Sequence, residues 1–305
     1  MRILVTGATG VIGRRAVPML VKAGHRVVAA GRNPGRLASL ARTGAGTATL
    51  DIFDPAAVRR AVEGQDAVIN LATHIPPSTL RMMLPGAWRE NDRVRREGAA
   101  NLAEAARDAG VSRFVQESFA PIYEDGGDRW LDESAPVHPV SYNRTVLDAE
   151  RSAERFGEGG GVGIVLRFAG FYGPDAWHLH DMLKSMRRGI APLPGRFDAF
   201  LSAISHDDAA AAVVRSLELP AGTYNVCDDE PLRRGEWFAA AAEAFGIPMP
   251  RPLPAFAARM MGSLGELLSR SQRMSNAKLR ASGWAPAYPS VREGFGAIAE
   301  VASAA

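Results

Sequence analysis

The feature that most constrains the fold is a cluster of glycines directly after a short apolar run. Ile3-Leu4-Val5 leads into Thr6-Gly7-Ala8-Thr9-Gly10-Val11-Ile12-Gly13, which predicts a strand, a tight turn and the start of a helix. Glycine permits a close backbone approach that a Cβ atom would block, and the helix N-terminus presents N–H groups and a positive dipole end to an anion. This context predicts a pyrophosphate site, with contacts from Gly7, Thr9, Gly10, Val11, Ile12 and Gly13.

After this turn, short β-branched runs alternate with stretches rich in Ala and Arg. Such alternation is typical of a parallel sheet with helices on both faces, an α/β fold. We expect strands at 3–5, 27–29, 48–50, 67–70, 114–116, 162–166 and 223–226, and helices at 11–23, 55–62, 89–109 and 141–156.

Composition narrows the class of protein. The 305 residues are 47% hydrophobic, enough for an enzyme-sized core, and the net charge of +3 with scattered Arg residues predicts no nucleic-acid partner. Cys227 is the single cysteine, so no internal disulfide forms and a cytoplasmic location is expected. We expect no membrane span, no signal peptide and no metal site, because no apolar run or Cys/His cluster has the required length or spacing.

Motifs along nearly the whole chain resemble the extended short-chain dehydrogenase/reductase superfamily, the NAD(P)-dependent epimerase/dehydratase family. They include Asp51-Ile52, Asn70-Leu71-Ala72, the run from Leu166 to Pro174, His206-Asp207-Asp208 and Tyr224-Asn225-Val226. The resemblance implies a doubly wound parallel Rossmann sheet and a smaller C-terminal substrate domain. We expect an NADP-binding domain at 1–170 with about 203–227, and a substrate-binding domain at 171–202 and 228–305.

The end of the second strand favours NADP(H) over NAD(H). Gly31 stands where the NAD enzymes of this superfamily carry Asp, and Arg32 follows with a guanidinium suited to a 2′-phosphate. Arg36 could add a second contact, and a merely solvated Arg32 is the alternative. The resemblance places Asp51 and Ile52 at the adenine, and also implies coenzyme contacts from Leu71, Ala72, Thr73 and Phe168.

The segment expected to carry acid–base chemistry departs from the superfamily. The resemblance implies a Tyr and, four residues later, a Lys that lowers the pKa of the phenol and holds the nicotinamide ribose. Tyr142 is present, but Val146 occupies the Lys position. The catalytic Ser or Thr aligns with Phe119, so Ser118 can replace it only if the turn is locally rearranged. Tyr142 and Ser118 are the candidate catalytic residues.

Loss of the lysine favours one direction of proton transfer, from Tyr142 to the substrate. A Tyr with a pKa of about 10 stays protonated at neutral pH, so it can donate a proton but is a poor base. The pattern therefore favours NADPH-dependent reduction of a carbonyl or activated double bond, with Tyr142 as proton donor. Two alternatives stay open: a redox-silent NADP(H)-binding sensor or structural protein, and an epimerase or dehydratase with a non-standard acid–base residue.

The substrate is less well defined by the sequence. No cation occupies 198–204, where relatives that bind nucleotide sugars usually carry an Arg, so we expect a small and rather apolar molecule. Candidate substrate contacts are His74, Trp177, His178 and Phe200. The resemblance also implies a homodimer.

Overall fold

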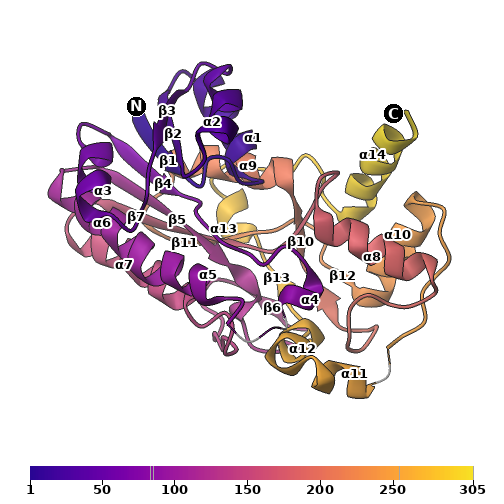
Figure 1. Cartoon of the computed structure of the whole chain (residues 1–305). Helices are drawn as coiled ribbons and strands as arrows, with labels where there is room; N and C mark the ends of the chain where they lie inside the picture. Colours follow the sequence, from indigo (N-terminus) through magenta and orange to yellow (C-terminus); the bar gives the residue numbers. More distant parts are fainter. Residues whose placement is uncertain (83, 85, 254, 305) are drawn as a thin grey trace.

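The computed structural model describes residues 1–82, 84, 86–253 and 255–304 and contains a seven-stranded sheet. All neighbouring strands are parallel, and their order is β11-β7-β5-β4-β1-β2-β3 (Figure 1). This is the predicted doubly wound Rossmann order, in which the direction of winding reverses between β1 and β4. The strands are β1 (Arg2–Thr6), β2 (Arg26–Gly31), β3 (Gly46–Thr49), β4 (Ala67–Asn70), β5 (Arg113–Phe119), β7 (Val162–Phe168) and β11 (Gly222–Val226).

The central strands read as continuous apolar runs because both faces of the sheet are covered. Neighbouring residues of a strand point to opposite faces. In β1, Leu4 belongs to one core cluster with Val68 and Phe114, whereas Ile3 and Val5 belong to the cluster on the other face.

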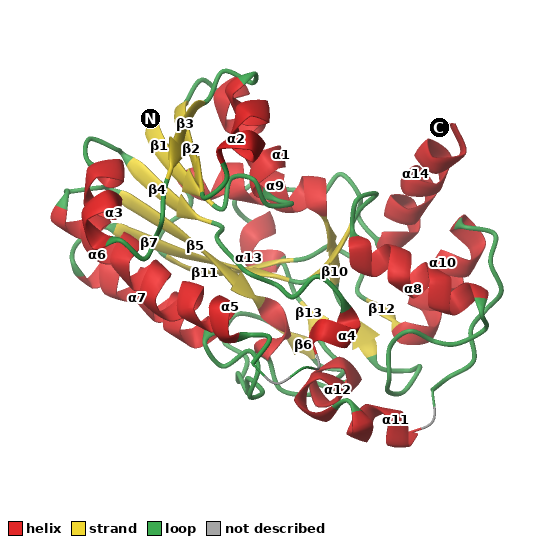
Figure 2. Ribbon diagram, in the orientation of Figure 1, coloured by secondary structure: helices red, strands yellow, loops and turns green. Residues whose placement is uncertain are grey.

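Helices from both halves of the sequence cover these two faces, as Figure 2 shows. One cluster contains residues of α1 (Gly13–Lys22) and α9 (His206–Arg215), which pack against each other. The other contains residues of α3 (Pro55–Val62), α6 (Ala99–Asp108) and α7 (Val146–Glu158).

Several helices begin at a residue whose side chain caps the first turn. Asn33 Oδ1 accepts from the backbone N–H of Arg36 at 3.1 Å at the start of α2 (Pro34–Ala41), and Asp54 caps α3 in the same way. Ser205 accepts from the N–H of Asp208 at 3.0 Å and begins α9. These oxygens satisfy backbone donors that have no partner within the helix.

Short strand pairs and further helices build the smaller C-terminal region (Figure 1). A third core cluster there gathers around Trp237, Phe238 and Phe295. The strand pairs are β8 (Gly170–Tyr172) with β10 (Ala203–Ser205), β9 (Phe200–Leu201) with β12 (Leu232–Arg233), and β6 (Trp130–Leu131) with β13 (Arg273–Met274). The remaining helices are α4 (Thr79–Met82), α5 (Arg89–Arg93), α8 (Trp177–Arg187), α10 (Arg234–Ala244), α11 (Ala255–Met260), α12 (Gly262–Ser269), α13 (Ala277–Arg280) and α14 (Val291–Ala304). Within the described ranges, none of the helices combines the length and the apolarity needed to cross a membrane.

Part of the predicted substrate domain packs with the Rossmann core. Met274, Leu279 and Trp284 belong to the cluster formed by α1, α9 and one face of the sheet, and α13 contacts β11. The segment around these residues therefore supports the nucleotide-binding sheet although it lies inside the predicted range 228–305.

Two predicted helices differ from the structure. The helix expected at 89–109 is interrupted, because α5 runs into a π-helical turn at Val94–Gly98 before α6 begins. The helix expected at 141–156 begins later, at Val146, and residues 141–145 form turns. Tyr142 consequently lies before the first turn of α7, and the one-turn spacing assumed between positions 142 and 146 does not hold.

Candidate active site

The glycine turn after β1 has the geometry that its sequence predicts. Gly7 has a φ of 68°, and a Cβ atom there would overlap the carbonyl group of Leu71. A Cβ atom on Gly13 would overlap the carbonyl oxygen of Gly7. The N–H of Gly10 donates to that same oxygen at 2.9 Å. The turn is therefore closed so tightly that only glycine fits at positions 7 and 13.

The start of α1 offers free donors beside this turn. Among the described residues, the backbone N–H groups of Val11, Ile12 and Gly13 have no acceptor. Val11 is exposed and Ile12 is half-buried. Unpaired N–H groups at a helix N-terminus suit a diphosphate, so the predicted pyrophosphate site fits this structure. Thr9 is half-buried and Gly10 is exposed in the same turn.

An acidic side chain from the C-terminal region reaches the same helix. Asp175 forms ion pairs with Arg14 and with Arg15, and the latter distance from Nη2 to Oδ1 is 3.0 Å. His206 Nδ1 lies 2.9 Å from the same Asp175 oxygen. Burial lowers the pKa of His206 to about 3, with a further contribution from Arg15, so the ring is neutral at physiological pH. Asp175 thus connects α1 to the region that follows β8.

At the adenosine end, the predicted phosphate contact is exposed but already paired. The Arg32 side chain is 60% exposed, and its Nη1 lies 3.0 Å from Oε1 of Glu90. Arg36 is exposed nearby on α2, and Asp51 is exposed after β3. Because surface ion pairs contribute little, a phosphate can compete with Glu90 for the guanidinium.

Ile52, the predicted adenine contact, packs against the π-turn. A Cβ atom added to Gly98 would lie 3.0 Å from Ile52 Cγ1 and closer still to Cδ1. Asn101 Nδ2 donates to the Ile52 carbonyl at 2.9 Å. Ile52 is buried, and the glycine in the π-turn gives it room.

The loop after β4 begins from a chain of buried side-chain hydrogen bonds. Thr6 donates to Asn70 Oδ1 at 2.7 Å, and Asn70 Nδ2 donates to Gln116 at 2.8 Å. Asn70 Oδ1 also accepts from the N–H of Ala72 at 3.2 Å. This network fixes the backbone that precedes Thr73 and His74, both of which are exposed. Leu71 is buried in the core behind Gly7.

Phe168 does not offer its side chain to a ligand. It is 1% exposed, belongs to the core cluster on the α1 face, and its ring lies 5.4 Å from that of Phe171. The side chain is thus part of the core, and the coenzyme contact at this position stays a prediction.

Tyr142 lies in the turn before α7, and its ring packs 4.6 Å from the ring of Trp88. Its hydroxyl has no hydrogen-bond partner among the described residues. Burial raises the pKa of Tyr142 well above its usual value, and the positive charges of Arg95 and Arg270 oppose that shift. The phenol is therefore protonated at neutral pH, as a proton donor must be.

No lysine replaces the missing one. Val146 is fully buried at the first residue of α7. Lys184 is exposed on α8 and lies 3.8 Å from Asp181, and Lys278 donates to the carbonyl of Thr223 at 2.7 Å. Lys22 ends α1. Arg144, two positions from Tyr142, is exposed.

Ser118 belongs to a buried network that differs from the role we expected. Its hydroxyl donates to the carboxylate of Glu150 on α7, which also accepts from Arg167 Nε at 2.8 Å and from Nη2 at 2.7 Å. Arg167 Nη1 donates to Tyr123 Oη at 2.9 Å, and that hydroxyl donates to Asn225 at 2.7 Å. Because its hydroxyl is occupied and the side chain is buried, the geometry gives Ser118 a structural role.

A second buried charge pair was not among the predicted site residues. Arg95 of the π-turn is 4% exposed and Glu117 of β5 is 12% exposed, and Nη2 of the arginine lies 3.7 Å from Oε1 of the glutamate. Burial raises the pKa of Glu117, while Arg95 lowers it. The available signal was an acidic residue inside a strand expected at the centre of the sheet, because a carboxylate buried there needs a partner.

The predicted substrate contacts are spread over several elements. His178 Nε2 lies 2.6 Å from the carbonyl oxygen of Phe171, and burial lowers the pKa of this histidine. Trp177 is half-buried and packs edge-to-face on His178. Phe200 is buried, with the guanidinium of Arg233 4.4 Å from its ring centre. In the described part of the chain, no group of three His, Cys, Asp or Glu side chains forms a metal site.

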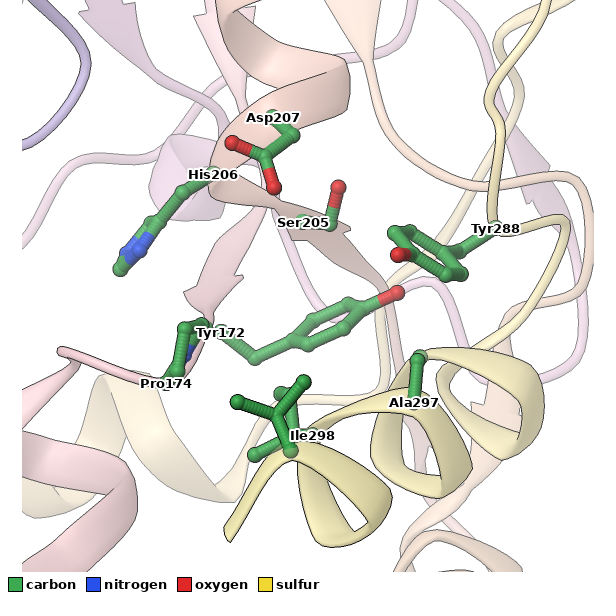
Figure 3. Close-up of a pocket in the computed structure, with 11 residues that line it drawn as sticks. Tyr172, Pro174, Ser205, His206, Asp207, Tyr288, Ala297 and Ile298 are labelled. Atoms are coloured by element: carbon green, nitrogen blue, oxygen red, sulfur yellow. The ribbon is translucent and has the colours of Figure 1, made fainter. Parts of the chain in front are cut away.

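A pocket of about 160 Å³ lies between β8, β10 and α14 (Figure 3). The ring of Tyr172 extends across it toward Tyr288, with Ala297 and Ile298 beside the ring. None of the lining residues is Tyr142 or one of its neighbours Trp88, Arg95 and Arg270. This pocket is thus separate from the environment of the candidate proton donor.

The fold and the glycine turn define the class of protein: the chain belongs to the extended short-chain dehydrogenase/reductase superfamily. Residues 7–158 match a family described as NAD(P)H-binding. The chain is 35% identical to a 3-diazoavenalumate denitrifying reductase of a Streptomyces species, over 97% of this chain and 99% of that protein. It is 26% identical to a 2-alkyl-3-oxoalkanoate reductase of Shewanella oneidensis, over 89% of this chain and 73% of that protein.

Among solved structures, a human epimerase family protein crystallised with NADPH has a TM-score of 0.83 and 23% identity, and the match covers 98% of this chain and 99% of that one. The full-length coverage confirms the fold of both regions. The two relatives in sequence named above are reductases, and they support an NAD(P)H-dependent enzyme.

Proposed function

We propose that this protein is an NADPH-dependent reductase that acts on a carbonyl or activated double bond of a small, rather apolar molecule. NADPH, when bound, supplies the hydride. Tyr142 donates the proton that the reduced oxygen or carbon requires. The protein holds the coenzyme diphosphate at the start of α1 and positions the ring of Tyr142 by packing it against Trp88.

The observation that carries this proposal is the state of Tyr142. Its side chain is half-buried, and its phenol is protonated and has no hydrogen-bond partner among the described residues, while Val146 replaces the lysine that would make it a base. Such a group carries a proton at neutral pH and can donate it to the oxyanion that hydride transfer creates, whereas the phenolate that would act as a base is scarcely populated before the reaction. Reduction needs only this direction, whereas epimerisation and dehydration need both.

Two features support NADPH as the preferred coenzyme. Gly31 leaves no carboxylate at the end of β2, and Arg32 follows it with an exposed guanidinium. A carboxylate at this point would repel a 2′-phosphate, and a guanidinium attracts one.

The direct test follows the absorbance of reduced nicotinamide with a panel of ketones and enones, for the wild type and Tyr142→Phe. We expect turnover in the wild type and about a hundredfold lower kcat in the variant. Tyr224→Phe, whose hydroxyl donates only to the Pro220 carbonyl at 2.9 Å, is the matched control. Tight NADPH binding without turnover on any substrate would instead favour the redox-silent protein.

A second candidate function is reductive removal of nitrogen from a diazo compound. The name of the 35% identical relative describes this reaction. When a hydride displaces dinitrogen from a diazonium carbon, R–N2+ and hydride give R–H and N2, and no proton is exchanged with the protein. Loss of the lysine and enclosure of Ser118 by Glu150 are the structural observations that favour a reaction without proton relay.

The two candidate functions predict different effects of Tyr142→Phe on the reaction rate. With an arenediazonium ion as substrate, we expect release of N2, transfer of deuterium from deuterated NADPH to carbon, and an unchanged rate in the variant. A rate loss restricted to carbonyl substrates would favour the first candidate. Consumption of NADPH without N2 would exclude the second.

The homodimer remains a proposal that rests on the resemblance alone. Light scattering at several protein concentrations would measure the mass of the species in solution, and a single 32.6 kDa species would contradict it.

A further inference from the structure

The charged groups of Arg95 and Glu117 lie further apart than those of a hydrogen-bonded ion pair. The 3.7 Å separation between Nη2 and Oε1 is longer than a hydrogen bond. Arg95 Nε and Glu117 Oε2 are both buried and have no hydrogen-bond partner in the described part of the chain. Buried charges usually have their hydrogen bonds satisfied, because an unpaired one destabilises the fold. The pair therefore has one donor and one acceptor that no group in the described part of the chain satisfies.

The position of this pair in the sheet indicates which ligand. A dinucleotide lies across the carboxyl ends of the strands, with its two halves on opposite sides of the point where the strand order reverses. Arg32 and Asp51 follow β2 and β3 on one side. Glu117 lies near the carboxyl end of β5, which pairs with β4 on the other side. The nicotinamide half belongs on that second side.

Contacts between two segments fix Arg95 beside the candidate proton donor. Trp88 packs on Tyr142, Asp92 accepts from Thr145 Oγ1 at 2.8 Å, and Arg96 Nε lies 3.3 Å from Asp148. Three successive turns that include α5 and the π-turn are therefore held against residues 142–148. π-turns are frequent at functional sites because they redirect side chains that a regular helix would place elsewhere.

Because the lysine is missing, another group has to bind the nicotinamide ribose. By resemblance, that lysine holds the hydroxyl groups of the nicotinamide ribose, and buried Val146 cannot donate a hydrogen bond. Arg95 is a buried cation on a different element, and its charge acts on Tyr142.

We propose that Arg95 and Glu117 together bind the nicotinamide ribose, with Arg95 donating to a ribose hydroxyl and Glu117 accepting from one. This inference rests on the proposed binding of NADPH. It assigns to a charged pair on the π-turn and β5 the task that a single lysine performs in the superfamily motif.

The test compares two ligands that share the adenosine half. Dissociation constants are measured by calorimetry for NADPH and for 2′-phosphoadenosine 5′-diphosphate, which lacks the nicotinamide riboside. For Arg95→Gln and for Glu117→Gln, we expect NADPH to bind about tenfold more weakly or worse and the fragment to bind within about twofold of wild type. Arg107→Gln, an exposed arginine of α6 whose ion pair is with the neighbouring Asp108, should change neither constant.

Other outcomes overturn the inference. Unchanged NADPH affinity in Arg95→Gln would show that this side chain does not contact the nicotinamide half, and equal weakening of both ligands would show a general change in the fold. If a single variant leaves an unpaired buried charge and does not fold, the double variant Arg95→Gln/Glu117→Gln removes both charges and is judged by the same two constants. Failure of wild type to bind NADPH would instead contradict the proposed function itself.

Discussion

At the scale of single residues, the same chemical group has different roles according to what surrounds it. Tyr142 and Ser118 were both candidate catalytic residues on sequence grounds. The Tyr142 hydroxyl has no partner in the described structure, whereas the Ser118 hydroxyl is bound to Glu150 within a network that reaches Asn225. We therefore propose that the first is available to a substrate and that the second maintains the core.

Ser118→Ala tests this division. Removal of one donor to a buried carboxylate should lower the free energy of unfolding by about 1–2 kcal/mol and leave kcat unchanged at saturating substrate. Denaturant unfolding and steady-state kinetics measure the two effects. A tenfold fall in kcat without loss of stability would restore Ser118 to the catalytic residues.

Arg32 and Glu90 give a second prediction at this scale. Glu90→Gln releases the guanidinium from its ion pair, so NADPH should bind a few-fold more tightly, since an exposed pair contributes up to about 1 kcal/mol. Arg32→Gln should weaken NADPH about tenfold and leave NADH unchanged. Titration with each coenzyme measures both effects, and identical constants in all three proteins would mean that Arg32 faces solvent in the complex.

At the scale of elements, our proposals place the π-turn between α5 and α6 at both ends of the coenzyme site. Gly98 lies against Ile52 at the predicted adenine position, and Arg95 lies beside Glu117 at the other end. One short irregular segment therefore influences both halves of the ligand.

Gly98→Ala should lower the affinity for the coenzyme while it leaves the stability of the fold nearly unchanged. The added methyl group displaces Ile52, so NADPH should bind several-fold more weakly. The gain in helix propensity of about 1 kcal/mol offsets the crowding, so the free energy of unfolding should change little. Ile52→Val in the Gly98→Ala background removes Cδ1 and should restore affinity. If the double variant binds no better than Gly98→Ala, crowding against Ile52 is not the cause.

At the scale of the whole molecule, Asp175, Arg15 and His206 connect the Rossmann sheet to the C-terminal region. The pKa of His206 is lowered to about 3 by burial, whereas an unfolded histidine has a pKa of about 6.5. The unfolded chain therefore binds a proton between these values and the folded chain does not. The stability from this residue is complete above about pH 6.5 and is lost as the pH falls toward 3.

A pH series of unfolding experiments tests this. Between about pH 7 and pH 5, wild type should lose up to about 2 kcal/mol through His206, and His206→Asn should lose correspondingly less. His138, an exposed histidine in the loop before α7, provides the control His138→Asn, which should follow wild type. Parallel curves for wild type and His206→Asn would contradict the prediction.

The sheet was easier to predict from the sequence than the site. Each strand follows from residues that are neighbours in the chain, whereas the site depends on contacts between residues that are far apart in it. Strands such as β1 and β4 follow from their own apolar residues, and the glycine turn follows from the backbone geometry that Gly7 and Gly13 allow. The pairing of Arg95 with Glu117 depends instead on contacts between separate segments, and the π-turn that positions Arg95 has no local signature. The burial of the Phe168 ring could not be predicted for the same reason, since only packing shows that it is enclosed.

Trp88 stacks on Tyr142 next to the presumed position of the nicotinamide. Indole emission overlaps the absorption band of the reduced coenzyme and not that of the oxidised one, and energy transfer is efficient over such a short separation. Quenching of this tryptophan should consequently follow the redox state of the bound nucleotide in real time, without any added dye. The protein would then provide its own optical signal for single-turnover measurements.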